Sequence, residues 1–229
     1  MKSLFRPSGG IRYHARAVAR QRLWAPFAAE VAAWLETWSI PHQQLTLIGP
    51  SAGYSLPTTW LNQFKQIQAY DLDPLAPLLF RRRHPGVPVT FHQRDMFWSQ
   101  GQLSSVPIAD MPGPILFCNI LGQLPLEGEV SEPKWELFLQ QLRTTLKGRS
   151  WASYHDLFSV ESVPHSQHQM IVQRYARAKD ITAVLTGLRV DVTDHMLAGQ
   201  WSADLENTLF TWSLSRNRLH IVSGVRSDS

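Results

Sequence analysis

Residues that could contact a ligand follow four short apolar segments between positions 45 and 119. The first segment, LTLI, is followed by GPSAG at residues 49–53. Asp71 follows the second segment, Asp95 the third and Asn119 the fourth. If these segments are parallel strands, their carboxyl ends lie along one edge of a sheet, where open α/β sheets bind ligands. We therefore expect one binding site that uses all four positions.

The glycine turn after the first segment favours a ligand with an anionic or polar group. Gly49 and Gly53 let the backbone turn tightly and approach a ligand, and the helix that follows presents unpaired N–H groups. Ser55 can cap that helix, and Pro57 suits its first turn. A turn of this kind is a weak indicator alone, since many strand–helix junctions need one only for packing.

Two aspartates end the second segment, in YDLDP. Asp71 lies 18 residues beyond Gly53, at a position where a carboxylate accepts hydrogen bonds from the hydroxyls of a ribose. Asp73, directly before Pro74, has the simpler interpretation of a helix N-cap. The sequence thus predicts a ribose at Asp71.

The elements that must position these residues alternate between strand and helix. The expected strands are residues 45–48, 67–70, 89–92, 115–119 and 150–155. The expected helices are residues 56–64, 75–83, 134–146 and 167–185. This alternation predicts a parallel sheet with helices on both faces. Two last strands, residues 209–215 and 218–225, flank the turn Arg216-Asn217 and predict a β-hairpin. The fold class is therefore α/β, Rossmann-like and doubly wound, with a mostly parallel seven-stranded sheet and a C-terminal antiparallel hairpin.

The segment before the sheet predicts an N-terminal helical cap, residues 1–40, on a core of residues 41–229. Apolar residues recur there at helical spacing, interrupted by Pro26. We expect one helix to end near Leu23 and a second to begin at about Ala25. Residues 121–132, rich in Gly, Pro and Glu, are expected to form a flap over the site.

Composition supports a single packed domain spanning residues 1–229. Hydrophobic residues make up 44% of the chain and charged residues 17%, which is ordinary for a globular protein. No window approaches the length of a membrane span, and we expect a cytoplasmic protein. The net charge is +4 but most basic residues are scattered, so nucleic acid is not indicated as a partner. Cys118, the one cysteine, cannot form an internal disulfide. Nothing in the sequence indicates the oligomeric state.

The four strand ends together resemble those of the class I S-adenosylmethionine-dependent methyltransferases, over about four-fifths of the chain. LIGPSAGYS is similar to the glycine-rich first motif of that family and YDLDP to its acidic second motif. RDMF is similar to the adenine-contacting third motif and FCNILG to the fourth. The resemblance implies a methyltransferase-like domain with S-adenosylmethionine as cofactor and methyl transfer as the reaction.

The same resemblance implies which residues hold the cofactor. They are Gly49, Pro50, Ser51 and Gly53 around the methionine part, Asp71 with Leu72 at the ribose, Asp95, Met96 and Phe97 around the adenine, and Asn119 and Leu121 near the ring or the sulfonium. Leu47 stands where the family usually carries an acidic residue, and Ser51 where it carries a middle glycine. These departures keep open a second hypothesis, a methyltransferase-like binding module without turnover.

Other cofactors fit the motifs less well. A P-loop needs a lysine that GPSAGYS lacks. The dinucleotide fingerprint needs a glycine where Ser51 stands, which leaves a nicotinamide-dependent oxidoreductase as a weaker alternative. His155, Asp156, His165 and His168 form a dense group without the HExxH pattern, so we expect no metal.

The acceptor side of the site is less defined by the sequence. Methyl transfer requires mainly alignment and exclusion of water, and a base only where the acceptor must lose a proton. The candidate bases are His14 and His155, and the candidate acceptor contacts are Tyr13, Tyr154, Asp156 and His195. The segment around Tyr13 and His14, after the hinge Ser8-Gly9-Gly10, is expected to close over the cofactor. Without a continuous basic face, a small-molecule acceptor is favoured.

Overall fold

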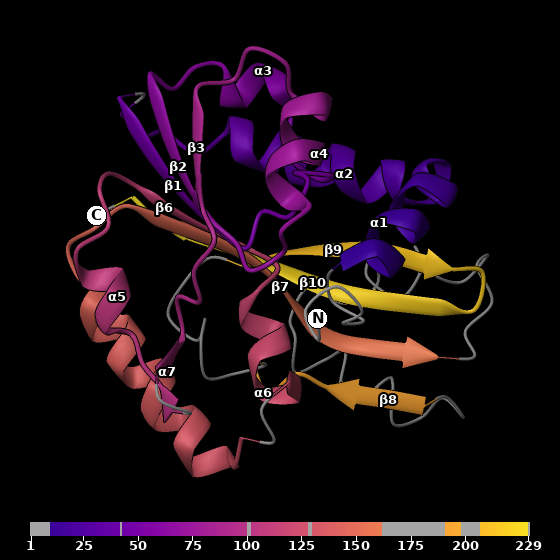
Figure 1. The fold of residues 1–229 in the computed structure, drawn as a ribbon. Helices are drawn as coiled ribbons and strands as arrows, with labels where there is room; N and C mark the ends of the chain where they lie inside the picture. The colour runs from indigo at the N-terminus through magenta and orange to yellow at the C-terminus, as the bar shows by residue number, and fades with distance from the viewer. Residues whose placement is uncertain are drawn as a thin grey trace.

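The computed structural model describes residues 10–41, 43–99, 102–127, 130–161, 191–197 and 207–228. The strands of its main sheet are β1 (Gln44–Ile48), β2 (Gln66–Tyr70), β3 (Val89–His92), β6 (Ile115–Cys118), β7 (Trp151–Glu161), β8 (Asp191–Asp194), β9 (Asn207–Ser215) and β10 (Arg218–Ser227). Seven of them follow the order β3-β2-β1-β6-β7-β10-β9, and β8 pairs with β7 (Figure 1). Two short strands, β4 (Trp98–Ser99) and β5 (Gln102–Leu103), pair separately.

The strand directions confirm the predicted fold class. Strands β3, β2, β1, β6 and β7 are parallel to their neighbours in this order. Strand β10 lies antiparallel between β7 and β9, so the chain ends in the predicted antiparallel hairpin. Strand β8, antiparallel to β7, was not predicted and makes this an eight-stranded sheet.

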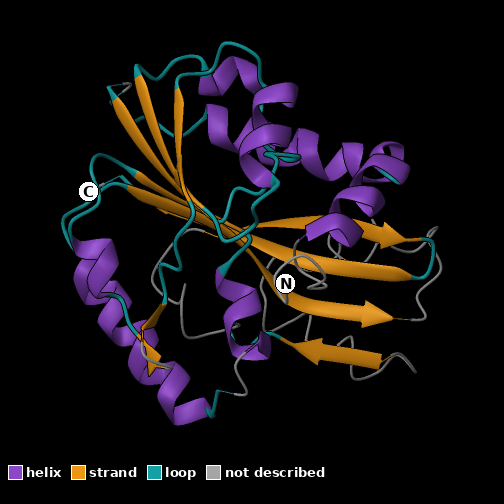
Figure 2. Cartoon of the chain, viewed as in Figure 1, coloured by secondary structure: helices purple, strands orange, loops and turns teal. Residues whose placement is uncertain are grey.

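Helices cover both faces of the sheet (Figure 2). One face carries α1 (Gly10–Ala19), α2 (Gln21–Glu36), α3 (Thr58–Leu61) and α4 (Ala76–Arg83). The other carries α5 (Val106–Ala109), α6 (Leu124–Glu127) and α7 (Glu132–Leu146). Leu47 belongs to the core under the first group and Ile48 to the core under the second, because successive side chains of a strand point to opposite faces. Burial on both faces explains why β6 is an uninterrupted apolar run, and in β1 the buried hydroxyl of Thr46 donates to the carbonyl of Pro112.

The break between the first two helices lies elsewhere than predicted. It falls at Arg20, and Pro26 lies inside α2. In the second turn of the helix, proline removes one backbone hydrogen bond. The buried face of α2, with Phe27 stacked on Trp212 of β9 at 5.0 Å between ring centroids, offsets that cost.

The prediction of a flap at residues 121–132 was wrong over its first part. Residues Leu121–Gln123 form a 3-10 helix that runs into α6. Leu121 and Leu124 are buried in the core beside α7, and their burial outweighs the turn-forming composition of the segment. Helix α3 is shorter than predicted, and the helix expected at residues 167–185 lies outside the described residues. No helix in the described ranges is long and apolar enough to cross a membrane.

Candidate functional site

The candidate site lies where the chain changes direction across the sheet. Strand β2 pairs with one side of β1, and β6 pairs with the other. Open α/β sheets bind ligands in the crevice outside the carboxyl ends of the two strands at such a point. Here Gly49 follows β1 and Asn119 follows β6.

The turn after β1 passes close to the turn after β6. Gly49 has φ +68°, and a Cβ added to it would lie 3.0 Å from Cβ of Ile120. The N–H of Gly49 donates to the carbonyl of Tyr70 at 2.8 Å. Ser51 has φ 50°, and its buried hydroxyl oxygen has no hydrogen-bond partner in the part of the chain that the structure describes. The turn therefore brings one unpaired hydroxyl to the switch point.

Gly53, the second glycine of the turn, faces α4. Its φ is +66°, and an added Cβ would lie 2.6 Å from Nε2 of His84 and 2.9 Å from the ring of Phe80. Nε2 of His84 donates to the carbonyl of Gly53 at 3.1 Å, and Nδ1 accepts from the hydroxyl of Thr58 at 2.8 Å. Burial lowers the pKa of His84. Packing alone explains this glycine.

A cavity of about 40 Å³ opens beside Gly49, with room for a few water molecules. Its walls include six aromatic side chains from separate parts of the chain: Tyr13, Trp24, Phe27, Tyr54, Tyr154 and Trp212. Gly49, Pro50, Ser51 and Asn119 from the predicted cofactor set also line it. A second hollow of about 170 Å³ shares Trp24, Ala28 and Tyr54 with this cavity. We call the first cavity the aromatic chamber.

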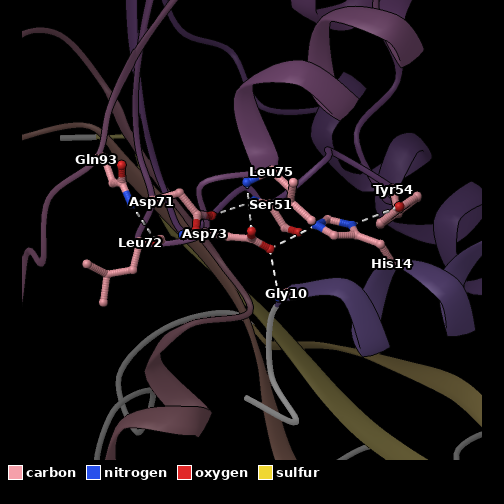
Figure 3. A network of polar contacts seen from close by, with 9 residues as sticks. All are labelled: Gly10, His14, Ser51, Tyr54, Asp71, Leu72, Asp73, Leu75 and Gln93. Carbon is pink, nitrogen blue, oxygen red and sulfur yellow. Dashed lines mark hydrogen bonds and ion pairs between the residues drawn. The ribbon is translucent and has the colours of Figure 1, made fainter. Parts of the chain in front are cut away.

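Asp71 closes the turn from the end of β2. Its Oδ2 accepts the N–H of Ser51 at 2.7 Å, and its Oδ1 accepts the N–H of Asp73 at 2.8 Å (Figure 3). Burial raises the pKa of Asp71 to about 6, although these two N–H groups act to lower it. Asp71 therefore joins the first and second motifs and lies at the ligand edge, outside the walls of the chamber.

Asp73 holds the beginning of α1, a role that the sequence did not reveal. Its Oδ2 accepts the N–H of Gly10 and contacts Nε2 of His14, both at 2.8 Å. The other ring nitrogen of His14 lies 2.9 Å from the hydroxyl of Tyr54 (Figure 3). Oδ1 of Asp73 accepts the N–H of Leu75 at 2.9 Å; the N-cap of α4 is Leu75 and not Asp73 as predicted, so this contact shapes the turn before the helix. Burial raises the pKa of Asp73, but the hydrogen bonds from His14, Leu75 and Gly10 outweigh it and leave the pKa below its ordinary value.

The residues predicted around the adenine divide into two groups. Oδ1 of Asp95 accepts the N–H groups of Phe97 and Trp98, and the carboxylate shapes the turn after β3. Met96 and Phe97 are buried in the core beneath the sheet, as is Leu121. Leu72 is 37% exposed beside Asp71. Leu72, predicted at the ribose rather than at the adenine, thus offers apolar surface at the edge.

Asn119 connects the chamber to a buried carboxylate on β7. The N–H of Asp156 donates to Oδ1 of Asn119 at 2.9 Å, and Nδ2 of Asn119 donates to Oδ2 of Asp156 at 3.3 Å. Gln123 donates to the same carboxylate oxygen at 2.5 Å. Burial raises the pKa of Asp156, but His220 and these donors outweigh it and hold the pKa below its ordinary value.

A chain of side chains extends from Asp156 across β10. Nδ1 of His220 lies 3.0 Å from Oδ2 of Asp156. Ser159 lies 3.0 Å from Nε2 of His220 and 2.7 Å from Nε2 of His195, and Nδ1 of His195 donates to the carbonyl of Gly122 at 2.5 Å. Strand β7 has a bulge, because Ile221 of β10 pairs with Phe158 and the next residue, Val222, pairs with Asp156. The bulge puts Asp156 and Ser159 on the same side of β7.

The contact with the carbonyl of Gly122 fixes the donors and acceptors at one end of this chain. A carbonyl only accepts, so Nδ1 of His195 carries a hydrogen, and burial lowers the pKa of this imidazole. Its Nε2 then accepts from Ser159, and Ser159 accepts from Nε2 of His220. The remaining nitrogen of His220, Nδ1, faces the carboxylate of Asp156 but makes no hydrogen bond among the described residues.

Of the candidate bases and acceptor contacts, Tyr13 and Tyr154 line the chamber. His14 contacts Asp73 and Tyr54, and Asp156 and His195 belong to the buried chain. His155 contacts Ser153, and burial lowers its pKa to about 3. Trp24, Phe27, Tyr54, Trp212 and His220 were not predicted as site residues; their types match core packing, and only the tertiary arrangement brings them together.

No protein-family model and no curated protein matches this sequence. The chain is similar to the solved structure of the N-methyltransferase NodS from Bradyrhizobium japonicum WM9 in complex with S-adenosyl-L-homocysteine. The identity is 13%, the match covers 100% of this chain and 96% of that chain, and the TM-score is 0.47.

Two further solved structures are similar. The DhpI complex with S-adenosyl-L-homocysteine matches at 14% identity over 93% of this chain and 92% of that chain, with a TM-score of 0.46. Magnesium protoporphyrin IX methyltransferase from Synechocystis PCC 6803, with the same molecule bound, matches at 14% identity over 88% of this chain and 82% of that chain, with a TM-score of 0.43. At TM-scores below 0.5, the fold assignment rests on the strand order of this chain itself. By that order the chain has the mostly parallel, doubly wound sheet and the C-terminal antiparallel hairpin expected from its resemblance to class I S-adenosylmethionine-dependent methyltransferases.

Proposed function

We propose that this chain binds S-adenosylmethionine at the carboxyl edge of its sheet and transfers the methyl group to a small-molecule acceptor. One observation carries the proposal. The glycine turn, Asp71 and Asn119 meet at the switch point of a parallel sheet, beside the aromatic chamber. The residues come from the ends of three different strands, and a ligand that spans them must be extended and polar at several points.

The residues present fit this cofactor. Among the described residues, the buried hydroxyl of Ser51 has no partner, and Gly49 of the same turn lines the chamber. Each oxygen of Asp71 accepts one N–H group. Because an ionised carboxylate has about four acceptor positions, two remain for the hydroxyls of a ribose.

The cofactor would be held by Gly49, Pro50 and Ser51 at its amino-acid part, by Asp71 at its ribose and by Leu72 at its base. Asn119 would lie on the far side of the crevice. Gly53, Met96, Phe97 and Leu121 pack within the protein, and they would support the site from behind. Asp95 would keep the turn after β3 in place.

Bound there, S-adenosylmethionine supplies an activated methyl group, and the protein has to hold the acceptor and exclude water. The aromatic rings of Tyr13, Trp24 and Tyr154 would exclude water from the chamber. His14 is engaged by Asp73, and His155 lies in contact with Ser153. We therefore expect no histidine base, and an acceptor atom with a free lone pair.

The alternative is a binding module without turnover. Leu47, fully buried in the core, leaves β1 without the acidic residue usual in the family, which favours this alternative. The test is release of S-adenosyl-L-homocysteine by purified protein with a broad panel of small acceptors. Product above a no-protein background supports the enzyme, and tight binding without any product supports the binding module.

A further inference from the structure

The aromatic chamber has an unusual wall. Its six rings come from α1, α2, the turn after β1, β7 and β9, and no Lys, Arg, Asp, Glu or His is among the described residues that line it. Trp24 and Trp212 meet edge to face at 5.0 Å, and Tyr13 and Tyr54 at 5.8 Å. The faces of aromatic rings carry partial negative charge and attract cations.

Two carboxylates near the wall act in the same direction as the rings, and the guanidinium of Arg16 opposes them. Burial raises the pKa of Tyr13, and Tyr54, Asp71 and Asp156 raise it further, against the opposing effect of Arg16. Two carboxylates thus make the electrostatic potential at this ring more negative. On the outer face of Tyr54, the guanidinium of Arg83 already lies 5.3 Å from the ring centroid, which is cation–π distance.

Three polar groups in the wall lack partners among the described residues. They are the hydroxyl of Ser51 and the indole N–H groups of Trp24 and Trp212. The two tryptophan side chains are each 6% exposed. A buried donor without a partner costs about 1–3 kcal/mol. Such donors are therefore usually paired, and a ligand oxygen would pair them here.

We propose that the aromatic chamber binds the methyl acceptor and that this acceptor is a small amine with a hydroxyl or carbonyl oxygen near its nitrogen. The inference rests on the proposed function, because the ligand of the chamber is a methyl acceptor only if the protein transfers a methyl group. The rings and the two carboxylates favour the positive charge that develops on the nitrogen as its lone pair takes the methyl group and the S–C bond of the cofactor breaks to leave S-adenosyl-L-homocysteine, and the indole donors take the oxygen. A neutral amine nitrogen has a free lone pair, which agrees with the absence of a base among the described residues that line the chamber.

The test compares two probes of the same shape. Choline and 3,3-dimethylbutan-1-ol have the same shape and one hydroxyl each, and they differ in the charge on the quaternary centre. We expect choline to bind at least about tenfold more tightly by calorimetry, with a change in tryptophan fluorescence. Equal affinities for the two probes would overturn the inference.

Variants of single tyrosines test whether the preference for choline over 3,3-dimethylbutan-1-ol arises in the aromatic chamber. Tyr13→Leu removes one ring of the wall and should reduce the preference for choline several-fold, whereas Tyr13→Phe should retain it. Tyr70→Leu is the matched control, because Tyr70 stacks on His92 and is not among the residues of the chamber wall. A loss of preference in the control equal to that in Tyr13→Leu would contradict the assignment to the chamber.

Repeating the titration with saturating S-adenosyl-L-homocysteine separates this inference from the proposed function. Choline affinity that is unchanged or stronger supports a separate acceptor pocket. Competition between the two would assign the chamber to the cofactor itself and overturn the inference. Selective choline binding by a protein that binds no S-adenosyl-L-homocysteine would contradict the proposed function alone.

Discussion

At the scale of single residues, two glycines with a positive φ, Gly53 in the first motif and Gly86 after α4, have different reasons to be glycine. Gly53 has a positive φ and a side chain of α4 where its Cβ would be, whereas Gly86 has φ +82° and nothing within 4 Å. The resemblance to the first motif led us to assign Gly53 to the cofactor site. The sequence alone does not show that His84 packs against this glycine. The contact with His84 and Phe80 is a sufficient explanation.

Gly53→Ala and Gly86→Ala therefore form a matched pair. Both variants should lose about 1 kcal/mol of unfolding free energy from the left-handed backbone. Gly53→Ala should lose about 1–3 kcal/mol more, because its Cβ meets the buried ring of His84. Denaturant titration measures both values. Equal losses in the two variants would show that the space at Gly53 is not filled by α4.

Asp71 makes stability depend on pH in an unusual direction. Burial raises its pKa to about 6 from an ordinary value of 3.8, so between these pH values the folded chain binds more protons than the unfolded chain. The contribution of Asp71 to stability is then fully present below about pH 4 and is lost as the pH rises through 6.

The variant Asp71→Asn does not titrate and isolates this effect. The unfolding free energy of the wild type relative to Asp71→Asn should fall between pH 4 and pH 7 by on the order of 1 kcal/mol, since Asp71 is only partly shielded from solvent. Denaturant titrations at several pH values measure the difference. A difference that grows in favour of the wild type would mean that the folded carboxylate is stabilised rather than destabilised.

At the scale of elements, α1 is held to the ligand edge by its own first turn. Gly10 and His14 both contact Asp73, and His14 also contacts Tyr54. Tyr13 between them lines the chamber. The sequence predicted a segment that closes over the site but could not show which residue holds it, because Asp73 lies more than fifty positions away.

Replacing His14 should loosen α1 without unfolding the sheet. In His14→Ala, two buried hydrogen bonds are lost, and we expect a loss of about 1–3 kcal/mol together with faster amide exchange in the rest of α1. Arg12→Ala, an exposed position on the same helix, is the control and should change neither. Unaltered exchange in α1 of His14→Ala would contradict a holding role for this contact.

Strand positions were easier to predict than helix boundaries. Buried strands such as β1 and β6 are short apolar runs, and their pattern is local. The break before α2 and the helical turns at residues 121–127 depend on side chains that pack from elsewhere, as Phe27 does on Trp212. Rules based on the position of a proline or on the composition of a loop use only neighbouring residues in the sequence, so they do not account for burial against distant side chains.

At the scale of the whole molecule, the alternation of strands and helices predicted the architecture, but the order of the strands was not predicted and comes from the structure. The carboxyl ends of β1, β2 and β6 meet at one edge, as expected for a parallel sheet. The chamber was not predictable, because its rings come from five segments that the sequence separates by up to about two hundred residues. The chain from Asp156 to His195 also needs the bulge in β7, which has no sequence signal.

The central claim is that this edge binds S-adenosylmethionine, and calorimetry with S-adenosyl-L-homocysteine tests it most directly. We predict saturable binding with one site per chain. Asp71→Ala should weaken it by about 1–3 kcal/mol, because the ribose hydroxyls lose a charged acceptor, whereas Asp110→Ala, on an exposed turn after α5, should leave it unchanged. Folding of both variants is checked by thermal unfolding. No heat of binding for the wild type at millimolar ligand would contradict the claim.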